Sequence, residues 1–311
     1  MKKTLIAACI LQLPLLSGCF TGVESTPKIT YKEVKHNKAE GSSKEESLAN
    51  SFVPQPFAKW QAGKPFYVTS ERIGLVVKPE ENEQPALATG NILIYQEFRN
   101  VTDLTGEEVV ELVMSLKDNP KMRYSYRTNA TAEKLNERAN LEIPFAIDLD
   151  LLNDVKIALV GKELYVKTPN WNDINGNAVN GRQFIPVHIT DVVPANEVYP
   201  YMVIFNDDNN EKHALYMSAA AGMRWMPRVF HTLFSFDNPR LNYPQITEEI
   251  WNSIINARVM KGMTKNEAKL AVGNPRNIDR GHDNSSAYEQ WSYSDGRYLI
   301  FQDGLLIRFN K

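Results

Sequence analysis

The sequence predicts an α+β protein in which mostly β modules precede a domain of two helices and a three-stranded antiparallel meander. Two observations support this fold class. From about residue 59 onward, Val, Ile, Tyr and Phe lie between clusters of Gly, Pro, Asn and Asp, as is typical of short strands and their turns. From residue 246 onward, the apolar residues first follow the period of a helix and then that of strands. Helices and strands are therefore expected in separate parts of the chain.

The N-terminus carries a targeting signal. Lys2 and Lys3 precede an apolar run over residues 5–16, which is shorter than the ~20 residues that span a bilayer. The next residues, Leu16-Ser17-Gly18-Cys19, resemble the bacterial lipobox. This resemblance implies that residues 1–18 are a signal peptide, cleaved between Gly18 and Cys19, and that Cys19 carries the lipid. The alternative is an ordinary secretory signal that contains a cysteine.

The cysteines and the residue after the lipobox bear on location. Only Cys9 and Cys19 are present, so the mature chain cannot form an internal disulfide. Acyl chains on Cys19 would hold it on a membrane without a transmembrane helix. Cys19 is followed by Phe20, whereas in enteric lipoproteins Asp at this place favours the inner membrane. By this analogy we expect the outer membrane, with the periplasmic face favoured over the cell surface.

Residues 19–58 are predicted to be a lipidated, flexible tether. Lys and Glu alternate in this segment, few residues are apolar, and Gly41-Ser42-Ser43 lies in its second half. Such a composition buries too little apolar surface to offset the entropy of ordering. The charges cancel, and the formal charge of the whole chain is −2, so nucleic acid is not expected as a partner.

The body is divided into two β modules, residues 59–130 and 146–240, with a helical connector over 131–145. The spacing of Ala132, Leu135 and Ala139 indicates the connector helix, which Pro144 closes. Late in the second module, after its last echoed segment, residues 219–227 are small and then bulky, and either line a pocket or pack inside.

An internal repeat relates the two modules. Three segments of the first are echoed about a hundred residues later, in the same order: 63–68 by 161–166, 92–95 by 184–187, and 112–115 by 215–218. Two copies of one small β module explain the pattern, and SH3-like barrels have this size. The alternative is that two unrelated strand-rich stretches share a Gly-Lys turn.

The C-terminal domain, residues 246–311, has the clearest local signals. Thr247 begins a helix with acidic residues in its first turn, and Thr264 and Glu267 form a capping box for a second helix. Gly273 and Pro275 end that helix. The segments 288–293, 297–302 and 305–310 are predicted strands, joined by the hairpin dipeptides Asp295-Gly296 and Asp303-Gly304.

These residues also carry a family resemblance. Lys261-Gly262-Met263-Thr264, Gly273-Asn274-Pro275, Gln290-Trp291-Ser292-Tyr293, Tyr298-Leu299-Ile300-Phe301 and Asp303-Gly304-Leu305 resemble the SmpA/OmlA (BamE-like) family of outer-membrane lipoproteins. The resemblance covers about a fifth of the chain. It implies a two-helix, curved-sheet fold and work in outer-membrane protein assembly. Its motif residues serve caps and turns, so it assigns no binding residue.

The sequence offers no motif for catalysis, cofactor or metal. The five histidines, His36, His188, His213, His231 and His282, do not stand at metal-ligand spacing. Asp148 and Asp150 lie in an apolar alternation typical of a strand edge, and Asp207 and Asp208 lie in a predicted hairpin loop. A glycosidase or calcium role for either pair is the alternative to solvated turn residues. We therefore predict no enzyme and no cofactor.

The predicted function is non-catalytic binding or scaffolding in outer-membrane protein assembly or envelope integrity. The predicted partners are the membrane, through acylated Cys19, and an envelope or outer-membrane protein. One alternative is a surface lipoprotein that binds glycan or peptide, which would gather Trp60, Trp171 or Trp225 on one face. The other is a hydrolase of envelope polymers, which would set two carboxylates across a cleft.

Overall fold

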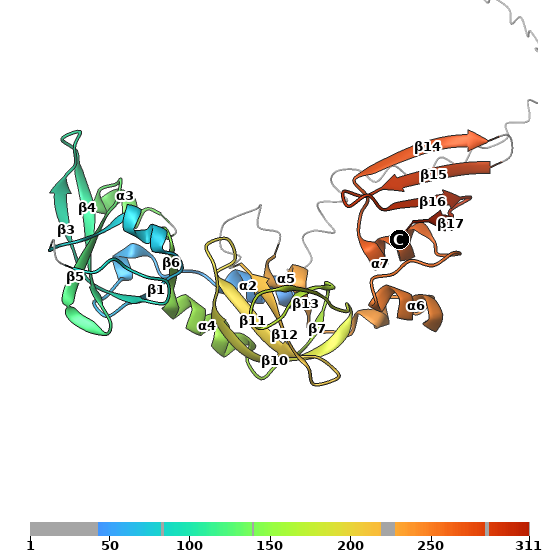
Figure 1. Ribbon diagram of the computed structural model, residues 1–311, viewed down its shortest axis with the longest axis horizontal. Coiled ribbons are helices and arrows are strands. Elements are labelled where there is room, and N and C mark those ends of the chain that lie inside the picture. The colour runs from blue at the N-terminus through green and yellow to red at the C-terminus, as the bar shows by residue number, and fades with distance from the viewer. Residues whose placement is uncertain (1–42, 82–83, 139, 219–227, 284–285, 311) are drawn as a thin grey trace, which may run out of the picture. The chain divides into compact units, whose positions relative to one another are not determined.

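Strands predominate in this mixed α+β fold. The computed structural model describes residues 43–81, 84–138, 140–218, 228–283 and 286–310, and the strands of these residues form three antiparallel sheets (Figure 1). Each sheet has its own cluster of buried hydrophobic residues. No helix within the described ranges is long and apolar enough to cross a membrane. Residues 1–42, with Gly18, Cys19 and most of the predicted tether, lie outside the description.

The first sheet has six strands in the order β2-β5-β4-β3-β1-β6. Short helices lie beside it: η1 (Phe57–Lys59), η2 (Glu71–Leu75) and α3 (Ala132–Asn136). Its core includes Phe66, Leu93 and Tyr124, which alternate with more exposed residues on their strands, and Leu112 of β4, whose neighbours are also buried. The strands are β1 (Pro65–Val68), β2 (Val77–Pro79), β3 (Ile92–Thr102), β4 (Glu108–Leu116), β5 (Asn119–Arg127) and β6 (Ala146–Asp148).

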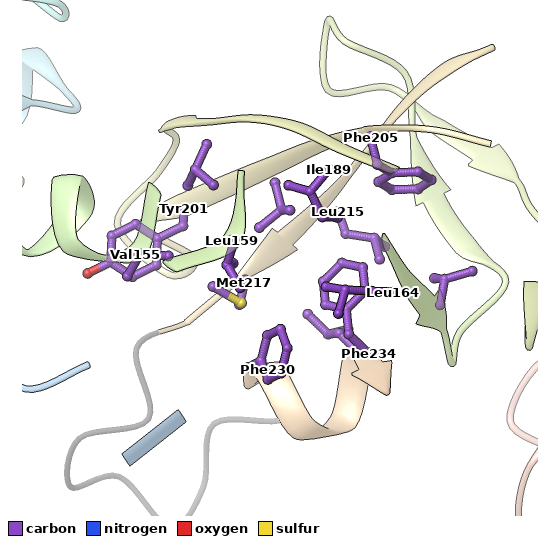
Figure 2. Packing of buried hydrophobic residues seen from close by; sticks show 14 of the residues in the cluster. Val155, Leu159, Leu164, Ile189, Tyr201, Phe205, Leu215, Met217, Phe230 and Phe234 are labelled. Atoms are coloured by element: carbon purple, nitrogen blue, oxygen red, sulfur yellow. The ribbon is translucent and has the colours of Figure 1, made fainter. Parts of the chain in front are cut away.

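The second sheet has seven strands in the order β13-β7-β10-β11-β12-β8-β9. It curls around the buried side chains shown in Figure 2, where Leu159 of helix α4 (Leu149–Leu159) and Phe230 of α5 (Phe230–Leu233) approach Met217. The strands are β7 (Glu163–Val166), β8 (Asn170–Asn172), β9 (Ala178–Asn180), β10 (Ile185–Pro194), β11 (Tyr201–Asn206), β12 (Lys212–Met217) and β13 (Phe234–Ser235).

The two sheets share one topology. Reading from β6 the first order is β6-β1-β3-β4-β5-β2, and reading from β13 the second is β13-β7-β10-β11-β12-β8, with β9 added. In sequence, β2 and β8 both follow the first strand of their sheet, and a short helix, α3 or α5, precedes the last strand, β6 or β13. The correspondence therefore extends over six strands.

Hydrogen bonds fix the register of this correspondence. The N–H of Gly63 donates to the Tyr95 carbonyl at 2.8 Å, and the N–H of Gly161 donates to the Ile189 carbonyl at 2.9 Å. Both glycines have positive φ, 103° and 81°, and the partner strand has a bulge directly after Tyr95 or Ile189. The first predicted echo therefore holds in register.

The other two predicted echoes are misplaced. Because Tyr95 corresponds to Ile189, residues 92–95 match 186–189, two positions beyond the predicted 184–187. Residues 112–115 lie on β4, which matches β11, whereas the predicted 215–218 fall on and beyond β12. Neighbouring strands have similar apolar texture, so letter matching alone chose the wrong one.

The predicted tether and connector need correction. Residues 44–51 form helix α2 (Lys44–Ser51), and Ala49 and the following Phe52 are buried in the core of the second sheet, so residues 44–58 are not a tether. The high Lys and Glu content concealed the apolar stripe of Leu48, Ala49 and Phe52. Helix α3 belongs to the first module, which ends at β6. The helix that leads into the second sheet is α4, within the predicted second β module.

The C-terminal unit contains α6 (Glu248–Ile255), α7 (Lys265–Val272) and a four-stranded sheet in the order β14-β15-β16-β17. The capping box of Thr264 and Glu267 is present. The predicted three-stranded meander is wrong by one strand, because β14 (Asn277–Asp283) lacks an apolar alternation and was missed. The others are β15 (Ser286–Ser292), β16 (Tyr298–Gln302) and β17 (Leu305–Phe309).

Candidate binding cavity

A cavity of about 430 Å³ lies where the first module leads into α4. Residues 140–148, which run into β6, form one wall, and residues 196–201 of the β10–β11 turn and the start of β11 form another. Pro54, Phe66, Leu151 and Ser218 complete the lining. Most of these side chains are apolar, and the volume is in the range of known ligand sites.

The charged side chains that line this cavity are acidic. Glu142, Asp148 and Glu197 are the acidic residues, and no Lys, Arg or His is among the described residues that line the cavity. Two of the three have a cation nearby outside the lining: Lys64 Nζ lies 2.8 Å from Asp148, and Arg72 lies 3.7 Å from Glu197. Glu142 accepts a hydrogen bond from Asn140 at 2.8 Å and makes no ion pair within the described part of the chain.

Lys64 is the buried cation of this region. Its side chain is 2% exposed and contacts Asp148 and Asp150, with the second pair 3.0 Å apart. Asp148 is the N-cap of α4 and accepts from the N–H groups of Asp150 and Leu151. Asp148 ends β6, but Asp150 lies in helix α4, so the prediction that both aspartates lie at a strand edge was wrong for Asp150. A buried ion pair of this kind fixes geometry, because separating it leaves a charge uncompensated.

Two hydroxyl groups belong to the lining. Ser218 is 2% exposed, and its hydroxyl has no hydrogen-bond partner among the described residues, which costs about 1–3 kcal/mol in a buried position. Burial raises the pKa of Tyr201, and the negative charges of Asp148, Asp154 and Glu142 raise it further. The Tyr201 phenol is therefore a neutral group at physiological pH. Both hydroxyls can donate to or accept from a ligand.

Phe145 holds a strained conformation in the cavity wall. Its φ is 65°, in the left-handed region that bulky residues rarely adopt. Its carbonyl accepts from the N–H and the hydroxyl of Thr69 at 2.9 and 3.0 Å, and the Arg72 guanidinium lies 4.8 Å from its ring centroid. Such strain costs about 1–3 kcal/mol and persists only where the surroundings impose it.

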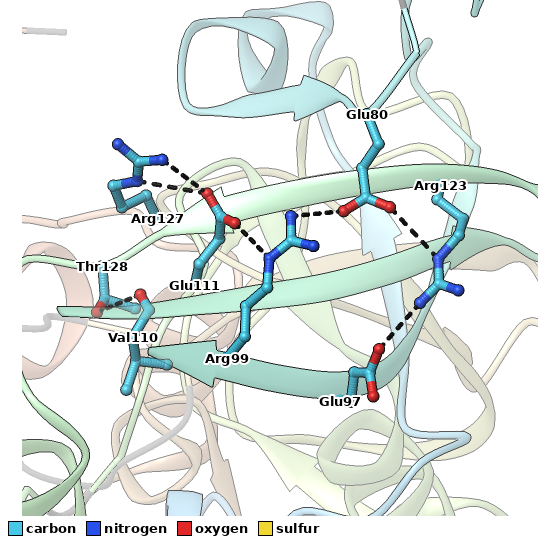
Figure 3. A network of polar contacts seen from close by, with 8 residues as sticks. All are labelled: Glu80, Glu97, Arg99, Val110, Glu111, Arg123, Arg127 and Thr128. Atoms are coloured by element: carbon cyan, nitrogen blue, oxygen red, sulfur yellow. Dashed lines mark hydrogen bonds and ion pairs between the residues drawn. The ribbon is translucent and has the colours of Figure 1, made fainter. Parts of the chain in front are cut away.

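A separate polar network crosses the first sheet (Figure 3). Glu111 is buried and binds Arg99 and Arg127 at 2.7 and 3.0 Å, while Glu80 joins Arg99 to Arg123. Burial raises the pKa of Glu111, but the hydrogen bonds and charges of both arginines outweigh it and hold the pKa below its usual value. Three glutamates and three arginines balance in this network, with Glu97 as the third acid, which indicates a structural role.

The one group with metal-ligand geometry found among the described residues joins Asp207, Glu211 and His213, whose candidate ligand atoms lie within 4.8 Å of one another. However, Arg182 donates to the same Asp207 carboxylate oxygen at 3.1 Å, so a cation already occupies it. Asp207 does lie in a hairpin turn, as predicted. It is not solvated, since its side chain is 4% exposed. The sequence analysis missed this grouping because it paired Asp207 with Asp208 and looked for histidines at short spacing, and did not combine Asp207 with Glu211 and His213.

The tryptophans of the described residues form no shared exposed platform. Trp171 is 3% exposed in the core of the second sheet, and Trp60 packs against Phe57, Phe66 and Tyr95 near the first. Trp225 and the rest of 219–227 lie outside the described residues.

In comparisons with known proteins, no family model matches the chain, and no curated protein matches its sequence.

Proposed function

We propose that this chain is an outer-membrane lipoprotein, anchored through Cys19 and facing the periplasm. It binds another envelope protein and catalyses no reaction. The observation that carries the binding role is the cavity, which is concave, largely apolar and furnished with a few polar groups, as binding sites are. The lipobox-like Leu16-Ser17-Gly18-Cys19 supports the anchor. Anchoring raises the local concentration of the cavity near its partner, so a modest affinity is sufficient.

The proposal includes the nature of the modules. The topology shared by the two sheets, with a short helix before the last strand, supports the interpretation as two SH3-like barrels. For the C-terminal unit, the capping box at Thr264, the helix end at Gly273 and the three hairpin-linked strands support the BamE-like assignment, while the additional β14 departs from it. On this basis we place the protein in outer-membrane protein assembly or envelope integrity.

The test of this proposal is made in cells. Wild-type protein and Cys19→Ala are compared for membrane fractionation, for maturation with and without globomycin, and for protease accessibility before and after the outer membrane is opened. We expect wild type to fractionate with the outer membrane and to be cleaved only after opening, and Cys19→Ala to lose the membrane. Wild-type protein that is soluble, or insensitive to globomycin, would contradict the anchor. Cleavage in intact cells would contradict the periplasmic facing.

One observation favours a second function, hydrolysis of an envelope polymer. Glu142 and Glu197 come from different elements and line the same cavity, as a pair of catalytic carboxylates would. The purified protein is incubated with peptidoglycan, beside Glu142→Gln and Glu197→Gln. Release of soluble fragments by wild type and by neither variant would establish hydrolysis and overturn the non-catalytic proposal.

A further inference from the structure

The charge of the cavity lining indicates the sign of the charge that its ligand carries. Three carboxylates and no basic residue are among the described residues that line it. Glu142 lies at the start of one wall and makes no ion pair within the described ranges, so its charge is free to act on whatever enters. A carboxylate or phosphate would be repelled, whereas a cation is attracted.

The apolar part of the lining excludes a ligand that is charged throughout. Phe66, Ile147, Leu151 and Tyr201 are buried residues of this lining, and Leu141 and Ile143 add to it from the 140–148 segment. A ligand must cover this surface to gain affinity, since burial of apolar area is the main driving force of association. A free polyamine would leave the apolar lining unfilled.

The hydrogen-bonding groups fit a guanidinium or ammonium. The unpartnered Ser218 hydroxyl and the Glu142 carboxylate both accept, and Lys and Arg supply several donors each. The walls are fixed before binding, because Lys64 holds Asp148 and Thr69 holds the Phe145 carbonyl. A preformed site binds with less loss of entropy.

We propose that this cavity receives the side chain of a lysine or arginine in a partner polypeptide, with a neighbouring apolar side chain packed on the apolar lining. This inference rests on the proposed binding function and specifies its chemistry. A single polypeptide segment can present a basic side chain next to an apolar one, which is the combination that the cavity requires.

The test measures peptide binding to the purified, detergent-solubilised full lipoprotein by calorimetry, with micelles alone as the blank. The probe is acetyl-leucyl-arginyl-leucine amide, and the comparison ligands are the peptide with glutamate in place of arginine and agmatine, which has the guanidinium without a peptide. We expect the arginine peptide to bind about tenfold or more tightly than either comparison ligand. Equal affinity for the glutamate peptide, equal affinity for agmatine, or no measurable binding of the arginine peptide would overturn the proposal.

Variants tie the binding to the cavity. Glu142→Gln should weaken binding about fivefold, the effect of one partly screened charge. Val198→Trp, which places a large ring at an exposed lining position, should abolish it. Glu108→Gln, an exposed acid at the start of β4, should leave it unchanged. Unchanged binding in both cavity variants would overturn the assignment to this site. Calorimetry detects peptide binding whether or not the protein reaches a membrane in cells, so failure of this test is distinguishable from failure of the envelope proposal.

Discussion

At the residue scale, a single polar group stabilises or destabilises the fold according to the hydrogen-bond partners around it. Ser218 leaves a buried hydroxyl without a partner, whereas Ser115, also buried, accepts a hydrogen bond from Gln96 at 2.9 Å. Glu289, on strand β15, lies between donors from its own sheet and from helix α7. A buried serine therefore stabilises or destabilises the fold according to whether its hydroxyl has a partner.

Ser218→Ala should raise the free energy of unfolding of the ligand-free protein by about 1 kcal/mol, because it removes a buried group that no partner satisfies. Ser115→Ala, the matched control, should lower it by about 1 kcal/mol, because the Gln96 amide loses one of its two acceptors. Chemical denaturation of both variants measures the difference. A loss of stability in Ser218→Ala equal to that in Ser115→Ala would show that the hydroxyl is satisfied.

Glu289 should make stability depend on acid. Hydrogen bonds from Trp291 and Lys265 lower its pKa from 4.5 to about 2. The stabilisation is therefore complete above pH 4.5 and is lost as the pH falls through about 2. Glu289→Gln should destabilise by about 1 kcal/mol at pH 7, after solvent screening, and this difference should shrink as the pH falls through about 2.

Denaturation curves of wild type and Glu289→Gln across this pH range make the measurement. Glu249→Gln, an exposed acid in the first turn of α6, is the control and should show little effect at any pH. A difference between wild type and Glu289→Gln that stays constant with pH would contradict the role of the carboxylate.

At the element scale, two short segments outside the sheets connect parts of the chain that are distant in sequence. Helix α2 places Ala49 and the following Phe52 in the second core. Gln183, 5% exposed before β10, donates through its side chain to the carbonyls of Ile254, Leu270 and Ala271 at 2.8, 2.9 and 3.0 Å. One side chain thus caps the last turns of both α6 and α7, whose terminal carbonyls lack partners within the helix.

Phe52→Ala should cost about 3–5 kcal/mol, the usual effect of removing a buried phenyl ring. Val53→Ala, the neighbouring residue that is 53% exposed, should change stability by less than about 0.5 kcal/mol. Thermal unfolding of both variants checks this. Equal and small effects would restore the tether interpretation for this segment.

Gln183→Leu should loosen both C-terminal helices, because the carbonyls of Leu270 and Ala271 lose their side-chain donor, at about 1–3 kcal/mol for a buried unsatisfied group. The Ile254 carbonyl keeps the N–H of Ala257 as a donor. Hydrogen exchange of the α6 and α7 amides should accelerate, and exchange in β4 of the first sheet should not change. Gln290→Leu on the exposed sheet surface is the control. Unaltered exchange in α6 and α7 would mean that the cap is dispensable.

At the scale of the whole molecule, the sequence predicted what local signals encode. The capping box at Thr264 and the Asp295-Gly296 and Asp303-Gly304 turns each lie within a few residues, and the structure has the expected helix and hairpins there. The cavity joins Pro54, residues 140–148 and Ser218, which only the fold brings together. Strand β14 was missed because it lacks an apolar alternation. Helix α4 was missed although its buried residues Leu151, Leu152, Val155 and Leu159 follow a helical period, because the stretch was interpreted as part of a strand.

The most direct test of the account places a photo-crosslinking amino acid at position 198 or 104 of the protein in living cells. Val198 is a 60% exposed residue of the cavity lining, and Leu104 is fully exposed in the β3–β4 turn. We predict that position 198, unlike position 104, gives a discrete cross-link to an envelope protein, and that Cys19→Ala abolishes it. The absence of a cross-link from position 198, or the same product from both positions, would contradict binding through this cavity.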